Sequence, residues 1–551
     1  MRILLWHGYL LGGTGSNVYN ARLAEALVGL GHDVHLLCQD RRPEGHLFVD
    51  ASGDWDGGEL RVCEIERADD AAERGARGAP GATREAGADP GGAQGRGRCV
   101  VYRPNIGGLL PVYVADRYDG IEARTFAQCS DTEVERYVEA NVAAVRELLE
   151  LVAPEVALAN HLIMGPLILA RALGGSVPYA VKVHGSALEY TVKPQPERFL
   201  AAAREGVAGA SAILVGSHHT AASLWEALDD RELAARTRLG PPGVDVRRFG
   251  PRDPAPGAAG VRALSATLRK LGEDASAGEA DDSAFARDEL AAADALARLD
   301  PERDQLVAFV GKLIVSKGVD LLIAAWPLVL EHEPRARLVV IGFGAYRDGL
   351  ERLAAALRDG DLEGAIAIAR AGRSLEKGSE PAQPLRHLLA FLEGLQGDAR
   401  ERYLAAAGGL DERIVMTGRL DHEELAELLP ACEALVVPST FPEAFGMVAA
   451  EGAACGALPV SAAHSGLLEV SEALAEAIPG EAARCLSFTV DDDAVSSVAG
   501  CLLGWLSIDH ELRVRTRAGL VETVRERWSW DRVARGVIAA AEGRLDGLQR
   551  P

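Results

Sequence analysis

The stretch ALVVPSTFPEAFGMVAAEGAACGALPVSA, residues 434–462, contains two short apolar runs separated by a helical pattern. The runs ALVVPS (434–439) and ALPVSA (457–462) are apolar at consecutive positions, which is typical of strands buried on both faces of a parallel sheet. Between them, a Phe-Pro turn precedes a run of small apolar residues. The stretch therefore predicts a β-α-β unit, the building block of a doubly wound α/β fold.

The same alternation of apolar runs and helical patterns extends along the chain in two series. The first series predicts strands at 2–7, 33–39, 156–161, 179–185 and 212–217. The second series predicts strands at 306–312, 337–343, 413–418, 434–439 and 457–462. Two such series predict two doubly wound parallel-sheet domains, each of which binds ligands at the carboxyl ends of its strands.

Changes in composition suggest the domain boundaries. We predict an N-terminal domain over 1–250, a linker or insertion over 251–304, a C-terminal domain over 305–525 and a last helix over 526–551. Residues 68–98 are rich in Gly, Ala and charges and almost lack large apolar residues, which predicts a disordered loop. An extra segment at about 359–404 interrupts the second domain, and its run PLRHLLAFLEGL predicts an amphipathic helix.

Composition excludes several classes of protein. The chain has 551 residues and a formal net charge of −23, which argues against a nucleic-acid-binding protein. Its eight cysteines form no C-x-x-C pair, so neither a zinc site nor a disulfide framework is indicated, and we expect reduced thiols in a cytoplasmic protein. No apolar run reaches the roughly 18 residues of a membrane span, although peripheral membrane association stays open. The oligomeric state also stays open.

Two lysines lie at the start of the second series of strands. In FVGKLIVSKGVDLLIAAW (309–326), Lys312 ends a predicted strand, Lys317 follows five positions later, and Gly318 opens a helix. The chain has only six lysines, so the placement of two here is unusual. Two exposed lysines without a function are the ordinary alternative. Ammonium groups at the carboxyl edge of a parallel sheet are suited to bind a diphosphate, which is the interpretation we favour.

Two glutamates stand eight positions apart in the opening stretch. Glu443 precedes the predicted helix, whose first turn we place at Ala444, Phe445, Gly446 and Met447. The N–H groups of that turn can hold phosphate oxygens. Glu443 can then accept hydrogen bonds from sugar hydroxyls. The second of the two glutamates, Glu451, is surrounded by small apolar residues and can chelate the hydroxyls of a ribose.

The opening HGYLLGGTGSNVYNARLAEAL (7–27) predicts a strand, a glycine loop and a helix that starts near Ser16. Gly12 and Gly13 permit close approach of a ligand to the backbone, although many such loops are only tight turns. The spacing also lacks the strict G-x-G-x-x-G of a dinucleotide site.

These motifs together resemble the retaining GT-B glycosyltransferases of glycosyltransferase family 4. The matching segments are GGTGSNVYNARLAEAL, VKVHGSALE, VGSHHT, PPGVDVRRFGP, VGKLIVSKGVDLLIAA, LVVIGFGAYRDGLE, VMTGRLDHEELAELLPAC, PEAFGMVAAEGAACGALPV and RWSWDRVARGVIAA. The resemblance covers most of the chain apart from the three extra segments. It implies GT-B architecture, with two Rossmann-like domains facing a cleft and a C-terminal helix that crosses back to the first domain.

The resemblance also implies a role for each matching residue. Glu443 would hold the donor sugar, the backbone of 444–447 the diphosphate and sugar, and Glu451 the ribose. Lys312 and Lys317 would stabilise the leaving diphosphate. Gly12 and Gly13 would close on the donor from the first domain. His184 would contact the donor sugar. Gly418 and Arg419 would lie where the family cradles the nucleotide base.

The sequence departs from the family pattern at two places. Position 312 is Lys where the family often has Arg, so the positive charge remains but bidentate phosphate binding is lost. The usual paired glycines after the E-x7-E strand are replaced by Ser465-Gly466, which leaves the identity of the donor sugar open. His161, His218 and His219 are predicted at strand ends facing the cleft, without an assigned role.

The implied reaction transfers a hexosyl unit from a nucleoside diphosphate sugar, with retention, to a sugar, lipid or small-molecule acceptor. No cofactor and no catalytic metal are expected. A nucleotide-sugar epimerase of the same fold is one alternative, and a catalytically silent nucleotide-sugar-binding protein is another. The excess of Arg over Lys and the abundance of Ala suggest a bacterial genome rich in G and C.

Overall fold

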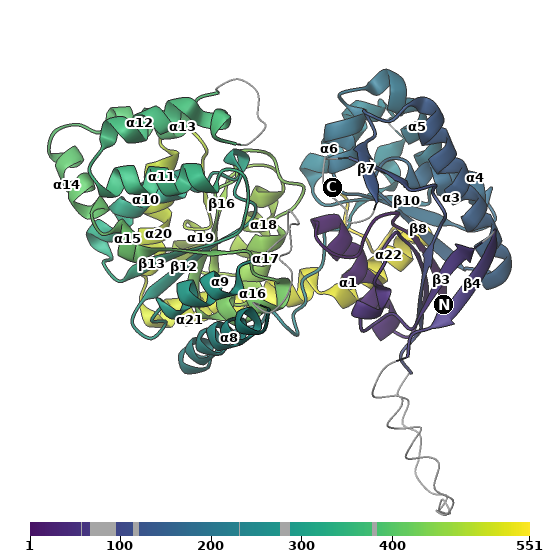
Figure 1. Ribbon diagram of the computed structural model, residues 1–551, viewed down its shortest axis with the longest axis horizontal. Helices are drawn as coiled ribbons and strands as arrows, with labels where there is room; N and C mark the ends of the chain where they lie inside the picture. The colour runs from purple at the N-terminus through teal and green to yellow at the C-terminus, as the bar shows by residue number, and fades with distance from the viewer. Residues whose placement is uncertain (57, 67–94, 114–120, 231, 276–286, 377–382) are drawn as a thin grey trace, which may run out of the picture. The chain divides into compact units, whose positions relative to one another are not determined.

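A computed structural model describes residues 1–56, 58–66, 95–113, 121–230, 232–275, 287–376 and 383–551 (Figure 1). The chain forms two compact units. The first unit consists of Met1–Gly243 together with Trp530–Pro551, and the second unit consists of Val244–Ser529.

A nine-stranded sheet forms the centre of the first unit, in the order β11-β10-β9-β8-β1-β2-β5-β3-β4. Its strands are β1 (Arg2–Trp6), β2 (Asp33–Leu37), β3 (Ala51–Asp56), β4 (Glu59–Glu64), β5 (Cys99–Arg103), β8 (Val156–Asn160), β9 (Tyr179–Val183), β10 (Ala212–Val215) and β11 (Thr237–Leu239). All neighbours are parallel except β3 and β4, which form an antiparallel hairpin at one edge. A separate parallel pair consists of β6 (Leu109–Val112) and β7 (Glu122–Thr125).

Helices pack on both faces of this sheet. They are α1 (Gly15–Gly29), α3 (Asp131–Val152), α4 (Gly165–Leu173), α5 (Pro196–Ala208), α6 (His218–Leu228), α7 (Leu233–Arg236) and α22 (Trp530–Ala541). Alternate residues of β1 enter separate cores: Leu4 and Trp6 pack with residues of α3, α4 and α5, whereas Ile3 and Leu5 pack with residues of α1 and α22. The last helix, α22, therefore completes the core of the first unit beside α1 (Figure 1).

The second unit contains a six-stranded parallel sheet in the order β14-β13-β12-β15-β16-β17. Its strands are β12 (Gln305–Val310), β13 (Ala336–Ile341), β14 (Ile414–Gly418), β15 (Cys432–Val437), β16 (Leu458–Ala462) and β17 (Ser487–Phe488). Two α/β sheets, parallel apart from the β3–β4 hairpin, confirm the predicted fold class.

Helices of the second unit surround this sheet. They are α8 (Pro254–Ala275), α9 (Glu289–Ala297), α10 (Val319–His332), α11 (Arg347–Arg358), α12 (Leu362–Ala371), α13 (Arg386–Gly394), α14 (Gly397–Ala407), α15 (Leu410–Arg413), α16 (His422–Leu428), α17 (Met447–Ala454), α18 (Ser465–Ala475), α19 (Gly480–Ala483), α20 (Ala494–Leu506) and α21 (His510–Trp528).

Two of the predicted extra segments are helical. Where the structure describes residues 251–304, they contain α8 and α9, which pack on each other and on α16 and β14 of the second unit. Of the two predicted alternatives, a linker or an insertion, these helices fit the insertion, because buried Val261, Leu268 and Leu296 join the core of the second unit. The described part of the segment 359–404 contains α12, α13 and most of α14, and α13 buries Leu388 and Leu392.

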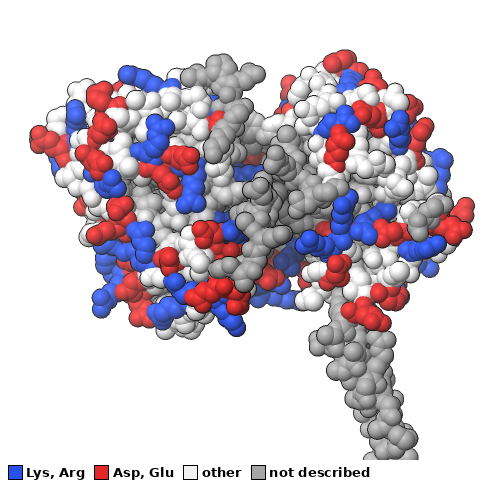
Figure 2. All heavy atoms as spheres, in the orientation of Figure 1, with Lys and Arg blue, Asp and Glu red and all other residues white. Residues whose placement is uncertain are grey.

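The predicted disordered loop 68–98 lies outside the described residues except for 95–98. Where the chain is described, none of its helices has the length and apolar character needed to cross a bilayer. On the viewed face, Lys and Arg side chains are interspersed with Asp and Glu side chains over both units (Figure 2).

Candidate active site

The candidate site is built from three loops that follow neighbouring strands. Strand β12 pairs with β15, and β15 pairs with β16, all in parallel. The loops that leave these strands, 311–318, 438–446 and 463–464, therefore start at the same edge of the sheet. This edge is where ligands bind in open parallel sheets.

Lys317 ends a short 3-10 turn, Val315–Lys317, that packs against the loop after β15. The backbone N–H of Thr440 donates to the Ser316 carbonyl at 2.9 Å. Gly318, which follows Lys317, has φ +66°, and a Cβ atom there would lie 2.0 Å from the Pro438 carbonyl oxygen. Glycine at 318 thus permits a close contact between the two loops, and this contact fixes where Lys317 emerges.

A closed ring of hydrogen bonds surrounds Glu443. Lys317 forms an ion pair with the Glu443 carboxylate, and the Ser439 hydroxyl donates to the same Oε1 atom at 2.6 Å. The Glu443 N–H donates to Ser465 Oγ at 2.9 Å, and His464 bonds Ser465 Oγ through Nδ1 at 3.0 Å and the Ser439 carbonyl through Nε2 at 2.8 Å. Because a carbonyl can only accept, His464 carries its proton on Nε2 and accepts from the Ser465 hydroxyl at Nδ1.

The loop between Glu443 and α17 is pressed against the start of α18. A Cβ atom on Gly466 would lie 2.7 Å from the N and Cα atoms of Phe445, and the Gly466 N–H donates to the Glu443 carbonyl at 3.0 Å. Helix α17 begins only at Met447, with Gly446 as its N-cap residue. The prediction that Ala444, Phe445 and Gly446 form a helical turn is therefore wrong. The physical reason is that the hydrogen bonds of Glu443 to residues 465 and 466 hold the following residues in a bent, non-helical conformation.

The first turn of α17 contains no acidic residue and no side chain caps it. Its backbone N–H groups, starting at Met447, therefore remain donors for an external acceptor. Glu451 lies one turn further along and is buried, with 5% of its side chain exposed. Its Oε1 atom is 3.3 Å from Nε2 of His422, the first residue of α16.

Three other predicted residues of the second unit lie at or just after the ends of β12 and β14. Lys312 follows β12 by two residues, is exposed, and forms no ion pair within the described part of the chain. Gly418 is the last residue of β14 and has φ +75°. Arg419 donates to Oδ1 of Asp421 at 2.9 Å. Strand β14 is separated from β12 by β13 in the sheet.

The remaining predicted residues, Gly12, Gly13 and His184, belong to the first unit. Gly12 and Gly13 are exposed in the loop between β1 and α1, and the Gly12 carbonyl accepts from Asn17 at 2.6 Å. His184 follows β9, and its Nε2 is 2.9 Å from Oδ1 of Asn160. Burial holds the pKa of His184 well below its usual range, so that this imidazole is neutral at pH 7.

The histidines without an assigned role fall into two cases. His161 follows β8 with φ +67°, and its ring lies between those of Tyr113 and His184 at 4.5 and 4.9 Å. Burial lowers the pKa of His161 far below 6.5. His218 and His219 are the first two residues of α6, so their predicted position at a strand end is wrong. Ser217 caps that helix and ends the extended segment one residue earlier.

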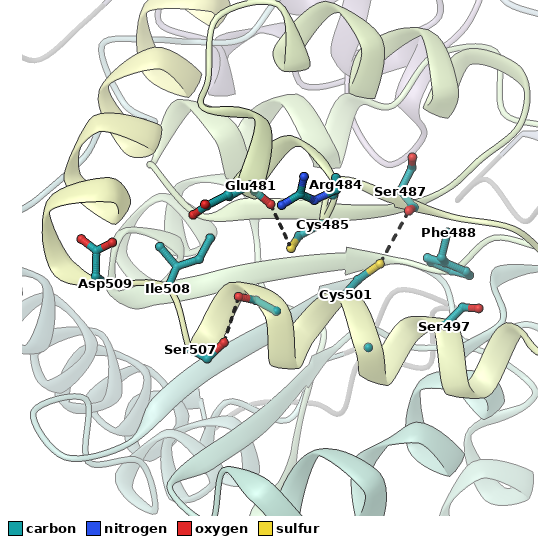
Figure 3. A pocket seen from close by; sticks show the side chains of 12 residues that line it. Glu481, Arg484, Cys485, Ser487, Phe488, Ser497, Cys501, Ser507, Ile508 and Asp509 are labelled. Carbon is teal, nitrogen blue, oxygen red and sulfur yellow. Dashed lines mark hydrogen bonds between the residues drawn. The ribbon is translucent and has the colours of Figure 1, made fainter.

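A pocket of about 790 Å³ opens at the other edge of the second sheet, between β17 and α20 (Figure 3). Cys485 and Cys501 point into it, and the thiol of Cys501 lies 3.6 Å from the Ser487 carbonyl. Burial raises the pKa of Cys501 to about 11, so the thiol is protonated at neutral pH. None of the twelve residues that line this pocket belongs to the predicted site.

The sequence did not predict that His422, Ser439 and His464 belong to the site. It also did not predict that the Ser465 hydroxyl accepts a hydrogen bond from the Glu443 N–H. Serines and histidines are common in loops, and no fixed spacing connects 422 or 439 to the glutamates. The only sequence signal was that Ser465 stands where the family has glycine.

Comparison with known families and structures is consistent with this arrangement. The Glycosyl transferase 4-like domain matches residues 14–232, and the Glycosyl transferases group 1 family matches residues 296–361 and 389–478. The interruption at 362–388 falls within the predicted extra segment of the second domain.

The curated relatives are glycosyltransferases. D-inositol 3-phosphate glycosyltransferase of Segniliparus rotundus is 31% identical over 257 residues, which is 47% of this chain and 44% of the relative. The gpi3 subunit of phosphatidylinositol N-acetylglucosaminyltransferase from Schizosaccharomyces pombe is 23% identical over 228 residues, 41% of this chain and 36% of the relative. The chain therefore spans less than half the length of these two relatives.

Solved structures support the fold over nearly the whole chain. Sucrose-phosphate synthase from Thermosynechococcus elongatus superposes with a TM-score of 0.52 at 18% identity and covers 98% of both chains. The N-terminal domain of trehalose-6-phosphate phosphatase from Candida albicans gives a TM-score of 0.53 at 12% identity and covers 99% of this chain and 97% of that one. With both domain families matched in order, the chain belongs to glycosyltransferase family 4, with the GT-B fold.

Proposed function

We propose that the protein is a retaining glycosyltransferase that moves a hexosyl unit from a nucleoside diphosphate sugar to a hydroxyl acceptor. The observation that carries the proposal is the ring around Glu443, which joins Lys317 and the loops after β15 and β16 at one sheet edge. Such a ring holds a carboxylate and an ammonium at the mouth of α17, whose free N–H groups suit a diphosphate.

Each group has a role in binding the donor. Lys317 keeps further N–H donors beyond its bond to Glu443, so it can bridge that carboxylate and a phosphate oxygen. Lys312, which is exposed, supplies a second positive charge for the diphosphate. Glu443 accepts from hydroxyls of the sugar, and Glu451 accepts from the ribose.

Transfer would proceed on one face of the sugar. The bond between the anomeric carbon and the phosphate oxygen breaks while the acceptor oxygen bonds to the same carbon from the same side. The acceptor proton passes to the departing phosphate. The two lysines and the N–H groups of α17 stabilise the charge that develops on the leaving group, which requires no metal ion in this scheme.

The names of the relatives suggest which acceptor to test first. Both curated relatives described above act, by name, on inositol phosphate compounds. We therefore propose D-inositol 3-phosphate and phosphatidylinositol as the first acceptors, with other glycans, glycolipids and small glycosides to follow.

The test incubates the full chain with UDP-, GDP- and ADP-sugars, with and without these acceptors, and follows release of nucleoside diphosphate and formation of product. Lys317→Ala and Glu443→Ala should each lower kcat at least about 100-fold, as loss of a transition-state contact predicts. The anomeric configuration of the product, read by NMR, tests retention. Wild-type activity in both variants, or an isomerised sugar nucleotide formed without acceptor, would overturn the proposal.

A further inference from the structure

Glu451 is a buried acid that needs a partner to stay ionised. Only 5% of its side chain is exposed, and the surrounding residues of α17, Ala449, Ala450 and Ala453, are small and apolar. An ionised carboxylate in such surroundings is costly unless hydrogen bonds or a positive charge compensate for the lost hydration. Nε2 of His422 lies 3.3 Å from Oε1 of Glu451, which is an ion-pair distance at which a protonated imidazole supplies that positive charge.

The position of His422 is itself fixed from two sides. It is the first residue of α16, after the N-cap Asp421, which forms a capping box with Glu424. Arg287 clamps this turn, because its Nη1 atom is 2.7 Å from Oδ2 of Asp421 and 3.0 Å from both carboxylate oxygens of Glu424. The ring of Phe249, which is buried, packs edge-on against the imidazole at 4.8 Å.

We infer that His422 is a positioning residue for nucleotide binding, which holds the Glu451 carboxylate in the orientation that receives the ribose hydroxyls. The inference rests on the proposed function, in which Glu451 binds the ribose. A carboxylate has two oxygens with about four acceptor positions, so the contact of His422 with Oε1 leaves acceptor capacity for two vicinal hydroxyls. His422 does not touch the reacting atoms in this arrangement.

A fixed carboxylate differs from a free one in affinity and in selectivity. A glutamate side chain that can rotate loses entropy when it is ordered by the ligand, whereas one already held by His422 does not. The chelated 2′-hydroxyl also contributes only if the carboxylate faces it. Loss of the His422 contact should therefore weaken nucleotide binding and reduce the preference for ribose over 2′-deoxyribose.

The experiment measures the Kd of UDP, GDP, ADP and their 2′-deoxy counterparts by calorimetry on the full chain. The variants are His422→Phe, which keeps a flat ring against Phe249 but has no donor, and His422→Gln, which retains an N–H donor. Glu451→Ala tests the ribose contact itself. His510→Ala is a matched control, because His510 also follows an aspartate N-cap, at the start of α21, and is exposed.

For the nucleotide that binds most tightly, wild type and His510→Ala should prefer the ribose form by about 10-fold, the value of one hydrogen bond to a charged group. His422→Phe should bind the ribose form about 10-fold more weakly than wild type does. The ratio of its Kd values for the 2′-deoxyribose and ribose forms should then be close to one. His422→Gln should restore most of both. A change in folding alone would weaken both forms equally and would leave the preference unchanged.

Two failures are distinguishable. If Glu451→Ala abolishes the ribose preference while His422→Phe retains it, the positioning role of His422 is overturned and the proposed function stands. If Glu451→Ala binds every ribose nucleotide as wild type does, the ribose contact itself is wrong, and the donor-binding part of the proposed function fails with it.

Discussion

At position 318 the backbone, rather than a side chain, sets the geometry of the candidate site. Gly318 adopts φ +66°, and a Cβ atom would meet the Pro438 carbonyl oxygen at 2.0 Å. We predict that Gly318→Ala lowers the free energy of unfolding by about 1–3 kcal/mol and weakens nucleoside diphosphate binding, because the loops that carry Lys317 and Glu443 must separate. Gly29→Ala, where a Cβ meets nothing within 4 Å, is the control and should leave both quantities unchanged. Equal behaviour of the two variants, in urea unfolding and calorimetry, would contradict the prediction.

Asp320, in the first turn of α10, makes the stability of the second unit depend on pH. Burial raises its pKa to about 7, and Oδ1 has no hydrogen-bond partner within the described residues. The folded state therefore keeps a proton that the unfolded state loses near pH 4, and stability falls as the pH rises from about 4 to 7. We predict that urea unfolding at pH 5 and 8 shows a loss in wild type that is up to about 3 kcal/mol larger than in Asp320→Asn. If the free energy of unfolding changes equally between pH 5 and pH 8 in the two proteins, this carboxyl is not buried in the folded state.

The site residues that could be predicted from the sequence are those whose spacing is set by a β-α-β unit. Lys317 and Glu443 each follow a strand of the same sheet, so topology alone predicts that they are close, and the structure places them in contact. His422 and Ser439 were not predictable, because their contacts arise from how α16 and the loops pack. The catalytic and binding roles of Lys317 and Glu443 stay predictions.

At the scale of elements, strands buried on both faces were predicted well, and exposed strands were missed. Strand β8 (Val156–Asn160) is entirely buried and reads as one apolar run. In contrast, β4 (Glu59–Glu64) is almost wholly exposed at the edge of the sheet, so its charged residues carry no apolar pattern. The sequence pattern predicts the start of α17 too early, because hydrogen bonds to a distant loop, rather than local propensity, determine it.

Helix α22 is the element whose burial is most easily tested. It buries Val537 and Ile538 in the core shared with α1, whereas Arg532 on the same helix is exposed. We predict that Val537→Asp lowers the free energy of unfolding of the first unit by about 3 kcal/mol or more, because the carboxylate enters an apolar core without a partner. Arg532→Asp introduces the same carboxylate on the exposed face and should change stability by less than about 0.5 kcal/mol. Comparable losses in the two variants would mean that α22 does not pack as described.

At the scale of the whole molecule, the two units differ in how many segments of the chain build them. The second unit is one continuous segment, Val244–Ser529, with its own hydrophobic core. The first unit needs two segments, because the core beneath α1 is completed by residues of α22 from the far end of the sequence. A polypeptide cut after Gly243 therefore loses part of a core, whereas 244–529 loses none.

This difference predicts how fragments behave. The fragment 244–529 should unfold cooperatively and bind nucleoside diphosphates with a Kd within about 3-fold of the full chain, because Lys312, Lys317, Glu443 and Glu451 all lie in it. The fragment 1–243 should aggregate or unfold without cooperativity, since the apolar surface that α22 covers is exposed to water. Joining 530–551 to it through a short Gly-Ser linker should restore cooperative unfolding, because a Cβ atom on Gly243 would lie only 2.4 Å from the ring of Trp530. If 1–243 unfolds as cooperatively as the linked protein, α22 is dispensable to that core; if 244–529 folds but binds no nucleotide, the donor site requires residues of the first unit.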